Sequence, residues 1–294
     1  MSPRPPSGKQ SPKHIEFTPA PTHLFPRDLA ADTILPMSVN LLAISVGNTR
    51  AHLGVFVEGS LEQSWAFSVA DNAELNRALR EAAARLADLD DAAVYLASVN
   101  PIAADRAAQA AVKLTGLPVQ HIGDDVSVPI GLHLDPESIV GVDRLLNAAA
   151  AYDRLQQACV VVDAGSAVTV DFIDGAGTFQ GGAILPGAQL MLRAMHEYTE
   201  QLPDVALTRP DEAIGHNTAQ AMLDGVYHGI RGAVRELVEK YAETYGAYPN
   251  IVATGGDAEL LFSDYELIES VVPELTLMGL AVTARYEIHG EPAP

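Results

Sequence analysis

Three short runs of small residues each follow an apolar segment that is typical of a strand. They are residues 47–49 (Gly-Asn-Thr), 163–166 (Asp-Ala-Gly-Ser) and 254–256 (Thr-Gly-Gly). Backbone N–H groups and hydroxyls at such turns can bind the oxygens of a phosphate. A single run would indicate no more than a hairpin turn. Three runs in one chain favour a nucleotide site with phosphate-binding loops.

A carboxylate and a cation, Asp143 and Arg144, stand side by side at the start of an expected helix. A carboxylate can accept the proton of an alcohol as a bond to phosphorus forms. The guanidinium fork of an arginine can hold a substrate carboxylate. Taken alone, the two residues are better interpreted as a solvated pair, because an aspartate is favourable at a helix start.

The chain is strongly acidic. Its 294 residues include 18 Lys and Arg against 38 Asp and Glu, which gives a formal net charge of −20. The 48% of hydrophobic and 19% of charged residues are typical of a folded protein. Nucleic acids and anionic membranes bind clustered Lys and Arg, so neither is expected as a partner. With only four lysines, a phosphate ligand would need backbone amides, a few arginines and metal ions.

Cys159 is the single cysteine, which excludes an internal disulfide and a cysteine-based metal cluster. It begins an apolar run and is predicted to be a buried hydrophobic residue, as is Trp65. No segment approaches the roughly 18 apolar residues of a membrane span, and no apolar signal core is present at the N-terminus. A cytoplasmic location is therefore expected.

The chain divides into three parts. Residues 1–40 are predicted to form a disordered extension, since residues 1–36 hold eight of the 19 prolines. Met37, just before the first strand signal, is a candidate start of the native protein. Residues 41–157 and 158–294 are expected to form two α/β domains that begin alike. Two such domains with a nucleotide cleft between them are the expected architecture.

Alternating apolar patterns predict strands and helices along both domains. Strands are expected at 41–46, 51–57, 64–69, 93–99, 160–162, 168–174, 178–185 and 251–253. Helices are expected at 74–89, 101–114, 142–155, 186–202, 217–245 and 275–288.

Six stretches in this order and spacing resemble the ASKHA (acetate and sugar kinase, Hsp70, actin) superfamily and, within it, the type III pantothenate kinases. They are residues 44–49 (Ile-Ser-Val-Gly-Asn-Thr), 141–144 (Gly-Val-Asp-Arg) with Asn147, 163–167 (Asp-Ala-Gly-Ser-Ala), 181–187 (Gly-Gly-Ala-Ile-Leu-Pro-Gly), 213–218 (Ala-Ile-Gly-His-Asn-Thr) and 254–256. The resemblance covers residues 41 to about 285. It implies two similar ribonuclease H-like (actin-like ATPase) domains.

The resemblance also implies an activity and a set of roles. The reaction would be ATP-dependent phosphorylation of pantothenate to 4′-phosphopantothenate, the first step towards coenzyme A, with Asp143 as general base in a homodimer. The ATP contacts would be Ser45, Val46, Gly47, Asn48, Thr49, Arg50, Gly165, Ser166, Thr254, Gly255 and Gly256. The pantothenate contacts would be Gly141, Val142, Asp143, Arg144, Thr218 and His133. Asp163 would coordinate a monovalent cation, K⁺ or NH₄⁺, and Mg²⁺ would accompany ATP.

One position departs from the family pattern. The first phosphate motif normally begins with an aspartate that helps to hold Mg²⁺, and here that residue is Ser45. A neutral hydroxyl is a poor partner for a hard divalent cation. Asp163 or Asp171 could take over the metal, or the enzyme could be slow. The alternative is a catalytically weakened relative acting as a ligand-binding regulatory protein.

Two further considerations rank these hypotheses. The active kinase leads because Asp143, Arg144, Asp163 and Thr218 are all present. Another kinase of the superfamily, such as a sugar kinase, is a third possibility that residues 141–144 and 213–218 disfavour.

Overall fold

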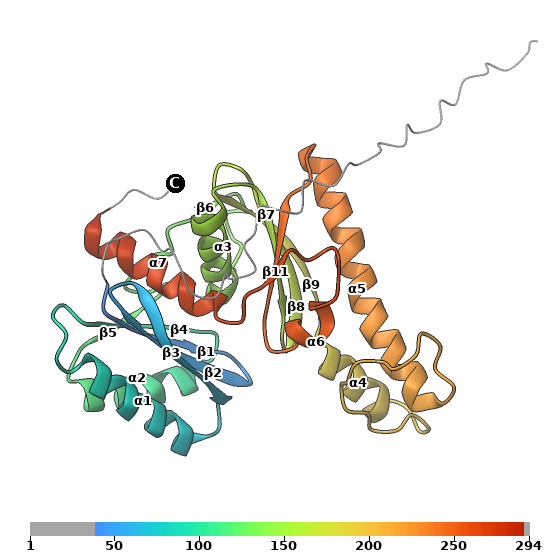
Figure 1. The fold of residues 1–294 in the computed structure, drawn as a ribbon, viewed down its shortest axis with the longest axis horizontal. Coiled ribbons are helices and arrows are strands. Elements are labelled where there is room, and N and C mark those ends of the chain that lie inside the picture. Colours follow the sequence, from blue (N-terminus) through green and yellow to red (C-terminus); the bar gives the residue numbers. More distant parts are fainter. Residues whose placement is uncertain (1–38, 291–294) are drawn as a thin grey trace, which may run out of the picture.

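The structure is a computed structural model that describes residues 39–290 (Figure 1). Two β-sheets stand side by side, with helices on their outer faces and two further helices between them (Figure 1). The expected α/β architecture with two similar halves is therefore present. The expected extension, apart from its last two residues, and Met37 lie outside the described residues.

The first sheet has the order β3-β2-β1-β4-β5. Its strands are β1 (Leu41–Val46), β2 (Arg50–Val57), β3 (Ser60–Ser68), β4 (Ala93–Ser98) and β5 (Val119–His121). Strands β1, β2 and β3 form an antiparallel meander, and β4 lies parallel to β1. Helices α1 (Asn72–Leu86) and α2 (Pro101–Thr115) bury alanine and leucine side chains against one face of this sheet.

The second sheet repeats this plan with the order β11-β10-β7-β8-β9-β6. Its strands are β6 (Gly131–Leu132), β7 (Cys159–Ala164), β8 (Ala167–Ile173), β9 (Thr178–Pro186), β10 (Asn250–Thr254) and β11 (Ser270–Val271). Strands β7, β8 and β9 form the meander, and β10 lies parallel to β7. Helices α4 (Ala188–Glu197), α5 (Thr218–Tyr245) and α6 (Ala258–Phe262) cover one face.

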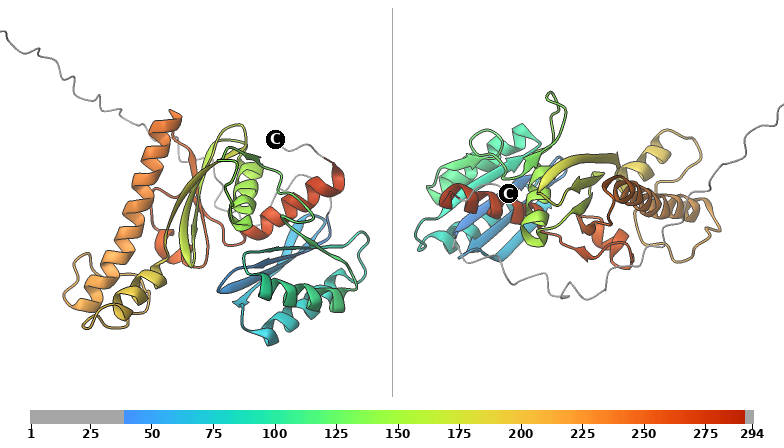
Figure 2. Two further views of the ribbon diagram at one scale, coloured as in Figure 1. Left: turned by 180° about the vertical axis from the view of Figure 1, so that it is seen from behind. Right: turned by 90° about the horizontal axis from the view of Figure 1, so that it is seen from above.

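Helices α3 (Val142–Leu155) and α7 (Leu275–His289) lie between the sheets (Figures 1 and 2). Helix α3 packs on the second sheet, whereas α7 packs on the first. Each sheet is thus covered on its inner face by a helix from the other half of the chain. The expected domain boundary between residues 157 and 158 stays a prediction.

Most predicted elements are found within one to four residues of their expected ends. The helix after Pro186 is shorter than expected, since it ends at Glu197 and not at Leu202. Leu202 precedes a proline, a position that disfavours helical backbone. Thr199 donates its hydroxyl to the carbonyl of Met195 at 2.7 Å and so satisfies one of the last carbonyl groups of the helix. Helix α6 and strands β5, β6 and β11 were too short to show a period.

The predicted burial of two residues is confirmed. Trp65 and Cys159 have exposed fractions of 9% and 0%, and burial raises the pKa of the Cys159 thiol to about 12. Among residues 39–290, no helix has both the length and the apolar character to cross a bilayer.

Contact between α3 and α7 depends on one glycine. A Cβ atom added to Gly279 would lie 2.2 Å from the carbonyl oxygen of Leu146, closer than packed atoms approach. We expect Gly279→Ala to lower the free energy of unfolding by about 1–3 kcal/mol, because the helices must separate. The measurement is urea-induced unfolding.

Gly232→Ala on α5 is the matched control, because nothing lies within 4 Å of a Cβ atom there. It should raise stability by about 0.5–1 kcal/mol through helix propensity. Equal effects of the two substitutions would contradict the close approach of α3 and α7.

Candidate active site

The first two predicted phosphate-binding turns meet between the sheets. Thr49 and Ser166 share a hydrogen bond of 2.9 Å between their hydroxyls, although 117 residues separate them in the chain. The turns are also closed in the same way. The N–H of Gly47 donates to the carbonyl of Arg50 at 2.9 Å, and the N–H of Gly165 donates to that of Ala167 at 2.9 Å. The duplication predicted from the sequence thus places equivalent turns face to face.

The third turn, residues 254–256, packs against the end of β7. Gly255 has a φ of +97°, and a Cβ atom there would lie 2.4 Å from the carbonyl oxygen of Ala164 and 2.4 Å from Asp163 Oδ1. The next residue along, Asp257, donates its N–H to the carbonyl of Ala164 at 2.9 Å. All three predicted turns are therefore assembled at one place.

Asp163 is held at the centre of this place by a chain of hydrogen bonds. Asn147 Nδ2 donates to Asp163 Oδ2 at 3.0 Å, and the hydroxyl of Thr276 donates to Asn147 Oδ1 at 2.7 Å. Asn147 is 1% exposed. Its amide orientation is fixed because an ionised carboxylate only accepts hydrogen bonds, so the NH₂ group faces Asp163 and the oxygen faces the hydroxyl of Thr276.

Burial, together with the neighbouring carboxylates of Asp143 and Asp171, raises the pKa of Asp163 to about 6, and the hydrogen bond from Asn147 opposes this shift. The ionised form of Asp163 is therefore disfavoured by burial and by the neighbouring negative charges. A bound cation would stabilise the ionised form, so the carboxylate fits the cation-binding role expected of it.

Asp143 and Arg144 begin helix α3, after Gly141 at its N-cap. Asp143 Oδ1 accepts the N–H of Arg144 at 2.9 Å. The guanidinium of Arg144 is paired with Asp171 of β8, with Nε 3.1 Å from each carboxylate oxygen and Nη2 in closer contact. It also lies over the ring of Phe179, at 5.5 Å from the centroid.

The ion pair between Arg144 and Asp171 bears on the expectation that Asp171 could hold the metal ion. Asp171 is 2% exposed and is engaged by Arg144, so its carboxylate is not free to replace the missing one at position 45. Burial raises the pKa of Asp171, while Arg144 opposes that shift. Across residues 39–290, no group of three or more His, Cys, Asp or Glu side chains is placed to hold a metal. A cation here would need phosphate, backbone or water oxygens as further ligands.

Ser45 lies on β1 directly opposite His52 of β2. Its side chain shares a sheet face with Leu41 and Ala43, the face that α7 covers. Burial and the nearby guanidinium of Arg50 lower the pKa of His52. The position thus carries two neutral side chains in place of the carboxylate expected from the family pattern.

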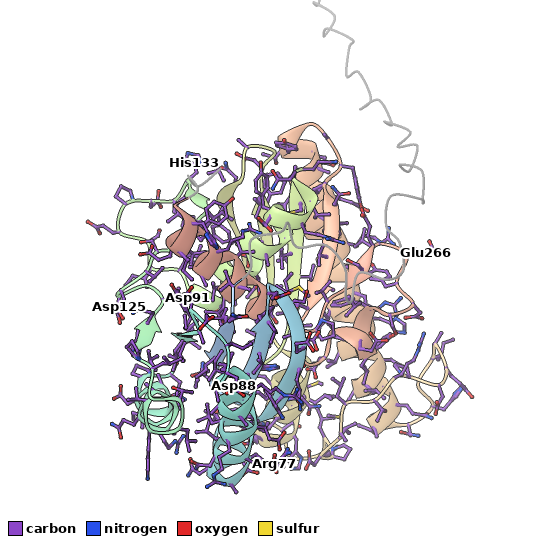
Figure 3. All side chains as sticks on the ribbon, turned by 60° about the vertical axis from the view of Figure 1, so that its left-hand side comes forward. Arg77, Asp88, Asp91, Asp125, His133 and Glu266 are labelled. Atoms are coloured by element: carbon purple, nitrogen blue, oxygen red, sulfur yellow. The ribbon has the colours of Figure 1, made fainter. Side chains whose placement is uncertain are left out.

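Two predicted substrate contacts lie apart from this assembly. His133 follows β6 at an edge of the molecule (Figure 3), where its Nδ1 is 2.7 Å from Gln180 Oε1. Thr218 begins α5 and is exposed. In the described part of the chain, no hydrogen bond or ion pair links either side chain to Asp143 or Asp163. Both roles stay predictions.

Residue-by-residue reasoning missed the roles of Asn147 and Thr276 in holding Asp163. Asn147 could have been found, because it lies four residues after Asp143 and therefore on the same face of α3. Thr276 gave no such signal, since it is 129 residues away from Asn147 in the chain.

The model of the family described as type III pantothenate kinase matches residues 41–240. The chain belongs to the type III pantothenate kinase family. A type III pantothenate kinase of Rhodospirillum rubrum is 36% identical over 255 residues, which cover 83% of this chain and 98% of the relative. A second, from Dehalococcoides mccartyi, is 34% identical and covers 84% of this chain and 97% of its own length. The type III pantothenate kinase match thus extends over nearly the whole described part.

Solved structures show the same fold at lower identity. A protein of Campylobacter jejuni, described as a conserved Baf family transcriptional activator, has a TM-score of 0.53 and 19% identity, and covers 85% of this chain and 98% of its own. The activator of 2-hydroxyisocaproyl-CoA dehydratase from Clostridium difficile, with bound ADPNP, has a TM-score of 0.50 and 13% identity, and covers 86% and 96%. The predicted fold class of this type III pantothenate kinase is confirmed.

Asp163 generates a pH-dependent prediction. Its pKa in the folded chain, about 6, lies above the ordinary value of 3.8. Between these values the folded state binds more protons, so this group's effect is to lower stability as the pH rises, and the loss is complete above about pH 6. We expect Asp163→Asn to raise the free energy of unfolding at about pH 8 by up to about 3 kcal/mol, and to have little effect near pH 3.5.

The measurement is urea unfolding at both pH values, in buffer without divalent or potassium ions. Asp88→Asn, at an exposed carboxylate after α1, is the control and should change stability little at either pH. An Asp163→Asn variant no more stable than the wild type at about pH 8 would contradict the argument.

Proposed function

We propose that the chain transfers the terminal phosphoryl group of ATP to pantothenate, giving 4′-phosphopantothenate in coenzyme A biosynthesis. The observation that carries this proposal is the meeting of three phosphate-binding turns around Asp163, beside Asp143, in a member of the type III pantothenate kinase family. Phosphoryl transfer needs little covalent help from a protein and depends on positioning and charge. This assembly offers both.

The first two turns would bind the phosphates of ATP. Turns 47–49 and 163–166 present hydroxyls and backbone N–H groups that the bond between Thr49 and Ser166 holds together. A nucleotide would displace or share that bond, since each hydroxyl can donate one hydrogen and accept two. Turn 254–256 would lie near the adenosine, where Gly255 and Gly256 allow close approach.

Asp143 would act as the general base. One of its oxygens, Oδ1, accepts a backbone N–H, and the rest of its acceptor capacity is available for the hydroxyl of pantothenate. Arg144 would attract the pantothenate carboxylate. Because its guanidinium is also paired with Asp171, the substrate would join an existing ion pair rather than create one.

Cations belong to the same proposal, since ATP is a polyanion and, of the three nearby carboxylates, the described residues provide a paired cation for Asp171 alone. Asp163 would hold a cation, for the reason given by its raised pKa. Bound Mg²⁺ would neutralise charge that develops on the transferred phosphoryl group, and K⁺ or NH₄⁺ would be the monovalent ion. Asp163 binds a cation only when it is ionised, and its raised pKa of about 6 means that cation binding is weakened below about pH 6.

No observation favours the regulatory alternative. The Campylobacter jejuni protein described as a transcriptional activator shares the fold at 19% identity, which carries no statement about function. A cytoplasmic location also stays a prediction.

A homodimer belongs to the same proposal. Large apolar side chains are exposed along adjoining segments at the end of β9, on α4 and in the loop before α5: Ile184 at 64%, Leu190 at 48%, Tyr198 at 86% and Ile214 at 72%. Exposed apolar patches of this kind mark protein interfaces. A second copy seated there would also bring its chain close to Thr218 at the start of α5.

The dimer can be tested by light scattering. We expect a mass of about twice 31.1 kDa, and Ile184→Glu should shift it towards the monomer because a buried charge is costly at an interface. Ile102→Glu is the matched control, since Ile102 is 83% exposed on α2 of the other half. A stable wild-type monomer would contradict the proposal.

The kinase activity can be tested with purified full-length chain, ATP and pantothenate, in the presence and absence of potassium. We expect turnover by the wild type, and a fall in kcat of about 10²–10⁴-fold in Asp143→Asn because the base is lost. Asp105→Asn, exposed on α2, should retain activity. Ser45→Asp is assayed beside them.

No turnover by the folded wild type, with recovery in Ser45→Asp, would show that the native chain is not an active kinase. Turnover of a sugar panel in preference to pantothenate would change the substrate assignment.

A further inference from the structure

Arg50 touches both sides of the site. It is the first residue of β2, and its carbonyl closes the first turn by accepting the N–H of Gly47. Its side chain reaches the third turn, because a Cβ atom added to Gly256 would lie 2.5 Å from Nη1 and 3.2 Å from Cζ. The guanidinium therefore lies directly over Gly256, between a turn of the first sheet and a turn of the second.

The guanidinium of Arg50 is available for a ligand. The residue is exposed, and within residues 39–290 its side chain makes no hydrogen bond or ion pair. Its positive charge nevertheless reaches both sheets. It lowers the pKa of His52 and opposes the rise that burial causes in the pKa of Asp257. The other cation of the site, Arg144, is already paired with Asp171.

Charges are divided unequally between the two sheets. On the side of the first sheet, residues 45–49 (Ser-Val-Gly-Asn-Thr) carry no charge, and Arg50 follows them directly. On the side of the second sheet stands the carboxylate of Asp163, whose Oδ2 accepts a hydrogen bond of 3.0 Å from the neutral amide of Asn147. A metal–phosphate ligand would therefore place its metal towards Asp163 and its remaining negative charge towards Arg50.

We propose that Arg50 binds the terminal phosphates of the nucleotide and supplies the positive charge on the side of the first sheet, where Ser45 offers no carboxylate to hold a metal ion. This deepens the proposed function and rests on its nucleotide site. It follows that part of the affinity for ATP does not require a divalent cation. A guanidinium suits this task because its planar fork can hold two phosphate oxygens at once.

The test is calorimetric binding of ATP and AMP to the full-length chain, in EDTA and then in excess Mg²⁺. In EDTA, we expect the wild type to bind ATP more tightly than AMP. Arg50→Gln should weaken ATP at least about tenfold, the cost of losing a hydrogen bond to a charged group. Binding of AMP should change much less, because AMP lacks the terminal phosphates.

Two further variants sharpen the test. Arg50→Lys keeps the charge without the fork and should be intermediate. Arg80→Gln is the matched control, because Arg80 is exposed on α1, on the opposite face of the first sheet. It should bind both nucleotides as the wild type does. Thermal unfolding of each variant confirms that it is folded.

Ser45→Asp adds a negative charge on the side of the first sheet, where the only charge among residues 45–50 of the wild type is that of Arg50. A carboxylate there should weaken ATP in EDTA by repulsion, and should make the gain in affinity on adding Mg²⁺ larger than in the wild type. In Mg²⁺, the double variant Ser45→Asp with Arg50→Gln should bind ATP more tightly than Arg50→Gln alone.

Two results would overturn the role of Arg50 while leaving the proposed function standing. One is wild-type binding of ATP only when Mg²⁺ is present. The other is an Arg50→Gln variant that binds ATP in EDTA as the wild type does but unfolds at a lower temperature, which would make Arg50 a structural contact to Gly256. Failure of the wild type to bind ATP under either condition would instead contradict the nucleotide site itself.

Discussion

Helices α3 and α7 touch backbone to backbone between the two sheets, and the geometry of the site follows from this contact. Gly279 of α7 lies against the carbonyl of Leu146 of α3, with no room for a side chain. About one turn before Gly279, Thr276 meets Asn147, the residue after Leu146, and Asn147 holds the carboxylate of Asp163. A helix that packs on the first sheet therefore fixes the orientation of an acid on the second. A movement of one sheet relative to the other would therefore change the position of the Asp163 carboxylate.

The cost of this arrangement is electrostatic. Asp163, Asp143 and Asp171 lie close together, and only Asp171 has a cation of its own, in Arg144. In water, solvent would stabilise three neighbouring carboxylates, but burial removes that solvent and raises the free energy of each charge. The rest of the chain does not supply the missing positive charge, because its net charge is −20. The negative charge of this site is therefore poorly compensated by the described residues, and the proposed nucleotide would bring a cation that offsets it.

The elements and turns could be predicted from the sequence because their signals are local. An apolar run ending in small residues marks a strand and its turn wherever the chain later places it. The pairing of Arg144 with Asp171 could not be predicted, since 27 residues separate them and any of several carboxylates would have served. The same holds for Thr276, for the reach of Arg50 to Gly256, and for the separation of His133 from Asp143. These contacts depend on how the two sheets meet.

The duplication of the strand–turn plan explains why the two halves of the site differ in charge rather than in shape. Both turns are closed by a glycine N–H donating to a carbonyl a few residues on, and both present a hydroxyl, Thr49 or Ser166. Backbone and hydroxyls suffice to bind phosphate oxygens, so their geometry is constrained in each copy. The charged residue next to each turn is not needed for this geometry and can therefore differ between the two copies. The first turn is followed by Arg50 and the second begins with Asp163, so opposite charges flank the site that is proposed to bind a metal ion and a polyanion.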